Sequence, residues 1–100
     1  MQEIEVTKED LGGGQGRYVA RINGGDDEAE LVFITRGANL ISADHTFAPP
    51  AMRGTGAASA LVQAMVDDAR ENGFKVIPRC SYVVAQAEQH PDWADVFVNG

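Results

Sequence analysis

The sequence predicts a single α+β domain in which a mixed β-sheet packs against helices. Three observations favour this class: strand-like runs fill the first half of the chain, one long helical pattern follows them, and another strand-like run comes after that helix. The predicted order is βββαβα, with the central amphipathic helix after the third main strand. Because 100 residues is an ordinary length for one domain, we expect residues 1–100 to form a single unit.

The first predicted elements lie before residue 28. Residues 2–10 alternate weakly, which indicates a short strand or a loose tail before a flexible turn in the glycine-rich run 12–16. Residues 17–22 alternate more clearly, as in a strand whose two faces differ in exposure to water. The run 23–27 (Asn-Gly-Gly-Asp-Asp) then has the composition of a turn.

Two further strands are predicted between residues 30 and 47. Residues 30–36 are rich in β-branched and aromatic side chains, and their continuous apolar centre suggests burial on both faces. After a turn at 37–39, residues 40–47 alternate again, with one face formed by Ile41, Ala43, His45 and Phe47. The short turns between the three main runs favour antiparallel strands.

The period then changes to that of a helix. Apolar residues recur every three or four positions, at Ala58, Leu61, Val62, Met65, Val66 and Ala69. Charged residues fall mostly on the opposite side, and Gly73 provides a C-terminal stop. The pattern therefore predicts an amphipathic helix that packs on the sheet.

One more strand and one more helix are predicted after Gly73. Residues 75–80 indicate a strand parallel to the third one, reached by a right-handed crossover. Pro78 cannot donate a backbone hydrogen bond, so this strand should lie at a sheet edge or diverge from its neighbour. Residues 81–89 predict a short helix that is capped by Ser81 and ends before Pro91.

Composition argues against several classes of protein. Eight basic against fifteen acidic residues give a net charge of −7, which argues against nucleic acid as a partner. An acidic surface could steer cationic amines toward the protein, but acidic composition is also a common means of keeping a protein soluble. We favour this second interpretation of the charge. No run is long and apolar enough to cross a membrane. With one cysteine and no signal-peptide pattern, we expect a cytoplasmic protein without an internal disulfide.

The loop from Arg53 to Ala58 carries the strongest functional signal, because it joins the third strand to the long helix. The first turn of a helix leaves N–H groups unpaired and carries partial positive charge, which favours an anion. Gly54 and Gly56 lack the Cβ atoms that would keep a diphosphate away from those groups, and Arg53 can add a charge-assisted contact. Small side chains at Ala57 and Ala58 keep the helix close to the sheet.

A structural reading of the same loop remains open, in which glycines simply turn a strand into a helix and Arg53 is solvated. The loop is not a Rossmann loop, since the G-x-G-x-x-G spacing is missing, and it is not a P-loop, since no Gly-Lys-Ser/Thr follows. Its position at a strand-to-helix junction favours the anion site.

Several motifs around this loop resemble the GNAT acetyltransferase superfamily. Residues 53–58 match the R/Q-x-x-G-x-G/A signature, which in that superfamily holds the diphosphate of acetyl-CoA, and the runs 45–47, 76–83 and 90–93 look like its short, minimal members. The resemblance covers about residues 17–97. It implies acetyl-CoA as the cofactor, bound by Thr46, Phe47, Ala48, Arg53, Gly54, Thr55, Gly56, Ala57 and Ala58.

The resemblance also implies that the third and fourth main strands splay apart and admit the pantetheine arm, which would explain Pro78. A cysteine at the position of Cys80 lies near the acetyl thioester in that family, which implies a nucleophile or a group that orients the transfer, and a following helix N-terminus would favour its thiolate. A lone cysteine can equally be a buried small hydrophobe. The family often carries an aromatic residue at about the position of Ala85 and Gln86. Neither residue is aromatic here, so the resemblance does not imply a cofactor contact at this position.

A second mechanism needs no covalent intermediate: an amine attacks the thioester directly, and a base or water removes its proton. The sequence names no convincing base, because His45 is best interpreted as a packing residue and His90 as part of a helix end. Tyr82 is either a proton donor to the departing thiolate or a packed aromatic residue. The histidines and Cys80 lack the spacing of a metal site.

These observations predict an acetyl-CoA-dependent N-acetyltransferase that acts on an unidentified amine, including an amine of a protein or peptide. The resemblance implies that helices shaping the acceptor site in longer relatives are missing, so we expect an acceptor pocket that is shallow or completed by another protein. The alternatives are a CoA-binding or adaptor module with little or no turnover, and a structural domain whose loop binds nothing. The sequence does not define the oligomeric state.

Overall fold

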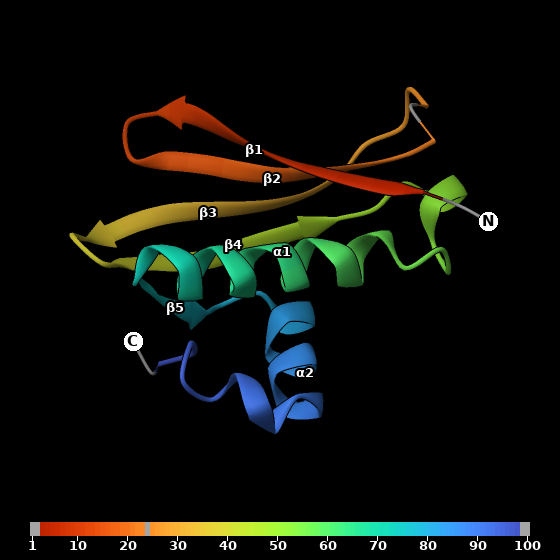
Figure 1. Ribbon diagram of the computed structural model, residues 1–100. Helices are drawn as coiled ribbons and strands as arrows, with labels where there is room; N and C mark the ends of the chain where they lie inside the picture. Colours follow the sequence, from red (N-terminus) through yellow and green to blue (C-terminus); the bar gives the residue numbers. More distant parts are fainter. Residues whose placement is uncertain (1–2, 24, 99–100) are drawn as a thin grey trace.

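The computed structural model describes residues 3–23 and 25–98 and confirms a small α+β domain with a mixed sheet (Figure 1). The elements, in chain order, are β1 (Ile4–Gly12), β2 (Gln15–Ile22), β3 (Ala29–Gly37), β4 (Leu40–Phe47), the 3-10 helix η1 (Pro50–Met52), α1 (Ala57–Asn72), β5 (Lys75–Pro78), α2 (Ser81–Gln89) and the 3-10 helix η2 (Pro91–Trp93).

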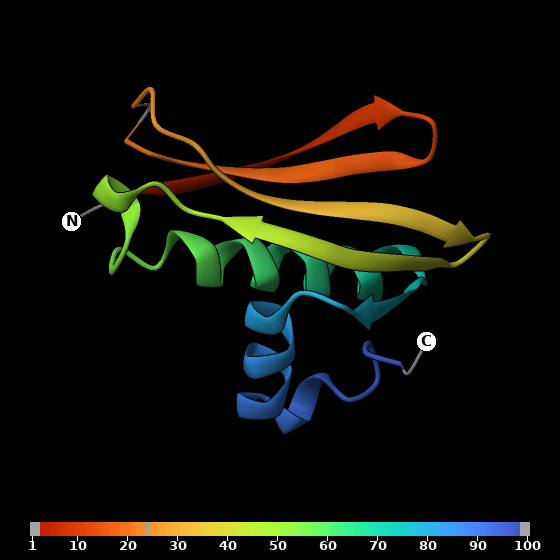
Figure 2. The ribbon, with the colours of Figure 1, turned by 180° about the vertical axis from the view of Figure 1, so that it is seen from behind.

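The five strands form one sheet in the order β1-β2-β3-β4-β5. Strands β1 to β4 pair antiparallel, and β5 pairs parallel to β4 after the crossover through α1, as predicted (Figure 2). The weak alternation of residues 2–10 belongs to a full strand, because β1 pairs with β2 along nearly its whole length. Gly13 and Gly14, both at positive φ, form the tight turn between these strands.

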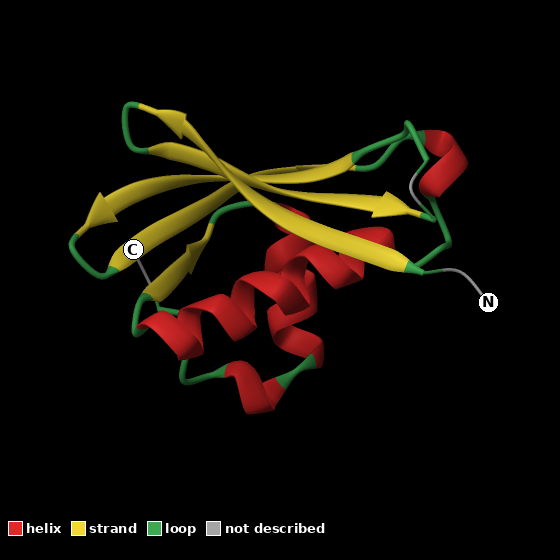
Figure 3. Cartoon of the chain, turned by 45° about the horizontal axis from the view of Figure 1, so that its top comes forward, coloured by secondary structure: helices red, strands yellow, loops and turns green. Residues whose placement is uncertain are grey.

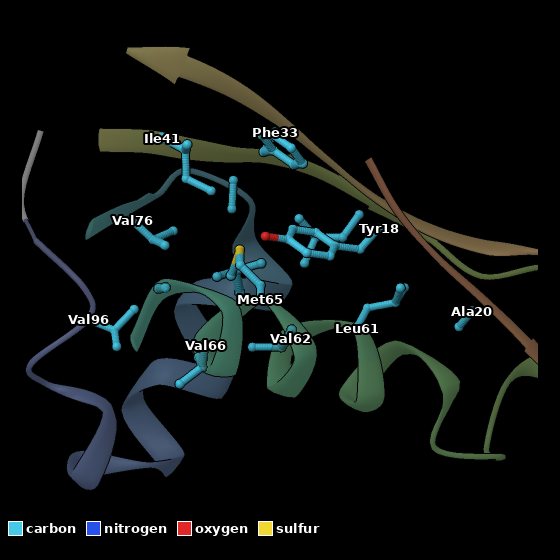
Figure 4. Packing of buried hydrophobic residues seen from close by; sticks show 14 of the residues in the cluster. Tyr18, Ala20, Phe33, Ile41, Leu61, Val62, Met65, Val66, Val76 and Val96 are labelled. Carbon is cyan, nitrogen blue, oxygen red and sulfur yellow. The ribbon is translucent and has the colours of Figure 1, made fainter. Parts of the chain in front are cut away.

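Helices α1 and α2 lie on the same side of the sheet (Figure 3), and the main core fills the space between the sheet and α1. Leu61, Val62 and Met65 of α1 are fully buried and pack among side chains of the strands, including Tyr18 and Phe33 (Figure 4). The apolar stripe of α1 begins at its first residue, Ala57, which is buried, whereas Ala58 is only half-buried. Ala58 was therefore wrongly predicted to lie on the buried face.

Strand β3 is buried on one face only, so the prediction of burial on both faces was wrong. Leu31 and Phe33 point into the core, while Val32 and Ile34 are half-buried on the opposite face. Within residues 3–23 and 25–98, no helix covers that outer face (Figure 3). The apolar run of β3 reflects strand propensity as well as burial.

A β-bulge at Asp44 changes the alternation of β4. Val32 pairs with His45 and Phe33 pairs with Ala43, so Asp44 is an extra residue without a partner in β3. The predicted shared face of Ile41, Ala43, His45 and Phe47 is wrong: Ile41 and Ala43 are buried, but His45 and Phe47 are exposed beyond the bulge. His45 is therefore not a core packing residue.

The chain after α1 follows the prediction with small shifts. Gly73 ends α1 with a φ of 75° and donates its N–H to the carbonyl of Ala69. Strand β5 ends at Pro78, earlier than the predicted Cys80, and it lies at the end of the strand order. Ser81 is the first residue of α2, and the cap position belongs to Cys80, so the predicted Ser81 cap was wrong.

Candidate functional site

The sheet opens where β4 and β5 separate. Their parallel pairing ends at Ala43 and Pro78, and the N–H groups of Arg79 and Cys80 both donate to the carbonyl of Ala43, at 3.1 and 2.9 Å. Beyond this point, residues 44–47 of β4 have no partner in β5. The divergence that was expected from Pro78 is therefore present, and it leaves one edge of β4 uncovered.

A cleft of about 460 Å³ lies beside this opening, which is an ordinary size for a ligand pocket. It brings together two separate predicted segments, the end of β4 and the loop before α1. Its lining residues are Thr46, Phe47, Ala48, Met52, Arg53, Gly54, Gly56, Ala57, Ala58, Ser59 and Tyr82. Every residue of the predicted cofactor set lines the cleft except Thr55.

Thr55 shapes the loop instead of lining the cleft. Its hydroxyl donates to the carbonyl of Met52, and its Oγ1 accepts a hydrogen bond from the N–H of Ala57 at 3.3 Å. Met52 and Ser59 are lining residues that sequence reasoning missed. Ser59 could have been found, because its N–H belongs to the first turn of the helix, where amides are unpaired.

Two left-handed glycines expose the head of α1. Gly54 has a φ of 79° and Gly56, the cap residue of α1, has a φ of 89°, conformations that cost other residues energy. Within the described chain, no group accepts a hydrogen bond from the N–H of Gly56, Ala58 or Ser59. The first turn thus presents free donors and the positive end of the helix dipole at the cleft.

The cleft is also free of negative side chains. Arg53 and Tyr82 are the ionisable residues that line it, and Arg53 is exposed with its Nε donating to the carbonyl of Ala48 at 3.3 Å. In a chain with a net charge of −7, this local absence of carboxylates favours an anionic ligand.

Cys80 lies beside the cleft without lining it. Its Sγ is 3.4 Å from the Oγ1 of Thr46, which does line the cleft. Burial opposes ionisation of the thiol, but the hydrogen bond with Thr46 and the nearby N–H groups of Val83 and Tyr82 outweigh it, so the pKa of Cys80 is lowered. The backbone N–H of Thr46 contributes in the same direction.

The other candidate side chains divide between the cleft and more distant places. Tyr82 lines the cleft, and burial raises its pKa. His90 follows the last residue of α2 and stacks on the buried ring of Trp93, with 3.9 Å between the ring centroids, and it is not among the residues that line the cleft. The described residues contain no cluster of three or more metal-binding side chains. None of the helices described is long and apolar enough to span a membrane.

A family model described as GCN5-related N-acetyl-transferase matches residues 17–96. The chain belongs to this family. The matched range includes both segments of the cleft. The GNAT family generally uses acetyl-CoA.

Individual GNAT relatives agree with the family match. The chain is 31% identical to Protein NATD1 of Gallus gallus over 75 residues. The aligned segment covers 75% of this chain and 68% of that protein. The match to Protein NATD1 of Homo sapiens has the same identity and covers 66% of the human protein. An NMR structure of a GCN5-like N-acetyltransferase candidate from Staphylococcus aureus has a TM-score of 0.62 and 28% identity, covering 96% of this chain and 89% of that one.

Proposed function

We propose that this protein binds acetyl-CoA in the cleft and transfers the acetyl group to an amine. The observation that carries the proposal is the set of backbone N–H groups of Gly56, Ala58 and Ser59, which meet no acceptor of the described chain. A diphosphate supplies the oxygen acceptors and the negative charge that the head of a helix favours. The general use of acetyl-CoA in the GNAT family supports the same assignment.

The surroundings of these donors fit a diphosphate. A Cβ atom at position 54 would meet nothing within 4 Å, and one at position 56 would meet only the Cδ1 of Ile4, at 3.9 Å, so the loop surface is open. The guanidinium of Arg53 uses one N–H on Ala48 and has further donors for a phosphate oxygen. Ala57 is 1% exposed and holds the first turn against the core.

The pantetheine arm would lie along Thr46, Phe47 and Ala48, where β4 has no partner in β5. Backbone N–H and C=O groups on an unpaired strand edge can hydrogen-bond the amides of the arm, as in the addition of a strand. The hydroxyl of Tyr82, which lines the cleft, would protonate the departing thiolate.

Acetyl-CoA would supply an activated acetyl thioester. In the route through Cys80, the thiolate attacks the thioester carbon, an Sγ–C bond forms, the bond from that carbon to the CoA sulfur breaks, and the released thiolate takes up a proton. An amine then attacks the acetylated Cys80, takes the acetyl group and loses a proton, and the thiolate returns. In the direct route the amine attacks the thioester itself, and Cys80 forms no bond.

Thermal unfolding with and without acetyl-CoA tests the binding step. We expect the Tm to rise by several degrees at saturating acetyl-CoA, because the ligand binds the folded chain. Arg53→Gln should reduce this rise and leave the Tm of the ligand-free protein unchanged, since Arg53 is exposed. No rise at millimolar acetyl-CoA would overturn the proposal and favour a structural domain.

Intact-mass analysis after incubation with acetyl-CoA tests the acetyl step. Cys80 is the single cysteine, so an added acetyl group that is absent in Cys80→Ser identifies the covalent route. Acetylation of an amine that continues in Cys80→Ser identifies the direct route. Binding without an adduct, an acetylated acceptor or hydrolysis would favour the CoA-binding or adaptor module. A panel of amines and peptides, read by mass spectrometry, identifies the acceptor.

A further inference from the structure

Thr46 connects the cleft to Cys80. Its side chain is half-buried and lines the cleft, while its Oγ1 lies 3.4 Å from the sulfur of Cys80, which is outside the lining. Cys80 is also half-buried, and its contact with Thr46 is the one side-chain hydrogen bond that the sulfur makes in the described part of the chain. Thr46 therefore links the lining of the cleft to the sulfur.

The bulge at Asp44 is what turns Thr46 toward the sulfur. Thr46 pairs with Leu31, and Leu31 is fully buried in the core, so Thr46 lies on the inward face of β4. Ala43 also lies on this face, three residues earlier, although a regular strand repeats every two residues. Without the extra residue, a side chain at position 46 would lie on the outer face, away from Cys80.

We propose that Thr46 is a positioning residue that holds the Cys80 sulfur beside the cleft, with the bulge at Asp44 fixing this contact. A hydroxyl can accept a hydrogen bond from the thiol S–H and donate one to the thiolate, so it serves the sulfur in both forms. Donation to the thiolate favours the reactive form. The role rests on the proposed function, because it matters to acetyl transfer only when Cys80 takes part.

Charged neighbours do not replace this contact. The ionisable groups on the adjoining elements are Asp44 and His45 of β4, Lys75 of β5, Arg79 between β5 and α2, and Tyr82 and Glu88 of α2. None of these side chains hydrogen-bonds the sulfur in the described structure. Asp44 already faces Arg36, with 3.4 Å between Oδ2 and Nη2. Thr46→Val should therefore remove the hydroxyl without removing a charge or much volume.

Alkylation of the single cysteine by iodoacetamide, followed from pH 5 to pH 10, tests the positioning role without acetyl-CoA. Thr46→Val should move the midpoint of the rate profile to higher pH, because the thiolate loses its hydrogen-bond donor. Thr46→Ser, which keeps the hydroxyl, should retain the wild-type midpoint. An unchanged midpoint in a folded Thr46→Val protein would overturn the proposal, as would Thr46→Ser behaving like Thr46→Val.

The acetylation rate of Cys80, measured by intact mass in the same three proteins, separates this inference from the proposed function. We expect Thr46→Val to lose acetylation at neutral pH and regain part of it at higher pH, while Thr46→Ser follows the wild type. If the wild-type protein gains no acetyl group, the covalent route fails while the alkylation profiles still report on Thr46. Where the wild type is acetylated, an equal rate in all three proteins would overturn the positioning role.

Discussion

The two ends of helix α1 differ in whether their polar groups have hydrogen-bond partners within the protein. Near the C-terminal end, Asp68 accepts hydrogen bonds from the Nζ of Lys8 and the hydroxyl of Tyr18, both at 2.7 Å, and from the side-chain amide of Asn72. The carbonyl of Ala69 is satisfied as well, by the N–H of Gly73. This end is closed, because its polar groups are matched within the protein.

The N-terminal end of α1 lacks such partners. The N–H groups of Gly56, Ala58 and Ser59 meet no acceptor in the described residues, and Gly56 provides no capping side chain. Unpaired donors lower stability when they are buried, but these groups adjoin a cleft where water or a ligand can reach them. The comparison indicates that the C-terminal end of α1 is fixed by contacts within the protein, whereas the N–H groups at its N-terminal end are available to bind a ligand.

Leu61→Ala should produce the largest effect, and it tests whether burial rather than either end holds α1 on the sheet. Leu61 lies between the two ends and is 0% exposed, so the cavity should cost about 2–5 kcal/mol of unfolding free energy. Urea denaturation measures the loss. Val84→Ala, at a residue of α2 that is 37% exposed, is the control and should change stability much less. Equal losses in the two variants would contradict the importance of α1 burial.

Gly56→Ala and Gly73→Ala form a matched pair that tests the two ends directly. Both residues have positive φ, 89° and 75°, and a Cβ atom would meet no close contact at either one. Each alanine should therefore cost about 1–2 kcal/mol through backbone strain. Only Gly56→Ala should also reduce the rise in Tm with acetyl-CoA, because strain at this cap position disturbs the first turn of α1, whose N–H groups form the proposed diphosphate site. An equal rise in Tm with acetyl-CoA in the two variants would contradict the proposal that only the N-terminal end of α1 binds the ligand.

Much of the open end could be predicted from the sequence, because glycine has a direct conformational meaning. Gly54 and Gly56 before a strong helical pattern indicated a helix head that no Cβ atom covers, and the N–H groups there are free of acceptors in the described residues. The positive φ of both glycines was not predicted. Long periodic segments such as α1 were equally clear. The exact start of α2 was not, since Ser81 and Cys80 are neighbours and helix boundaries depend on local geometry.

The contact between Thr46 and Cys80 could not be predicted, because it depends on strand pairing. The run from Ala43 to Phe47 alternates perfectly as a sequence, and only its register against β3 reveals the extra residue Asp44. A bulge changes which side chains share a face without changing the composition of the strand. The half-exposed outer face of β3 was missed for a similar reason, since the helices cover only one face.

Asp68→Asn tests the closed end through its dependence on pH. Burial opposes ionisation of Asp68, but hydrogen bonds from Lys8 and Tyr18 outweigh it, so the pKa of Asp68 is lowered. A carboxyl whose pKa is lower in the folded state stabilises the protein above its unfolded pKa of about 4 and loses that effect as pH falls through the folded value.

We therefore expect Asp68→Asn to be less stable than the wild type at pH 7, with the difference shrinking as the pH falls from about 4 toward 3. Urea denaturation across this range measures it. Asp67→Asn is the control, because Asp67 is exposed and accepts a hydrogen bond only from Gln63 in the described chain. A difference between wild type and Asp68→Asn that does not change with pH would contradict an ionised, hydrogen-bonded carboxylate.

Ser81→Ala should have the smallest effect, and it extends the comparison to the start of α2. A serine that caps a helix contributes about 1 kcal/mol, but Ser81 occupies the first helical position and makes no capping hydrogen bond. The variant should therefore unfold within about 0.5 kcal/mol of the wild type in urea. A loss near 1 kcal/mol would mean that Ser81 caps α2 after all. The first amides of α2 would then be shielded from Cys80, and one cause of its lowered pKa would disappear.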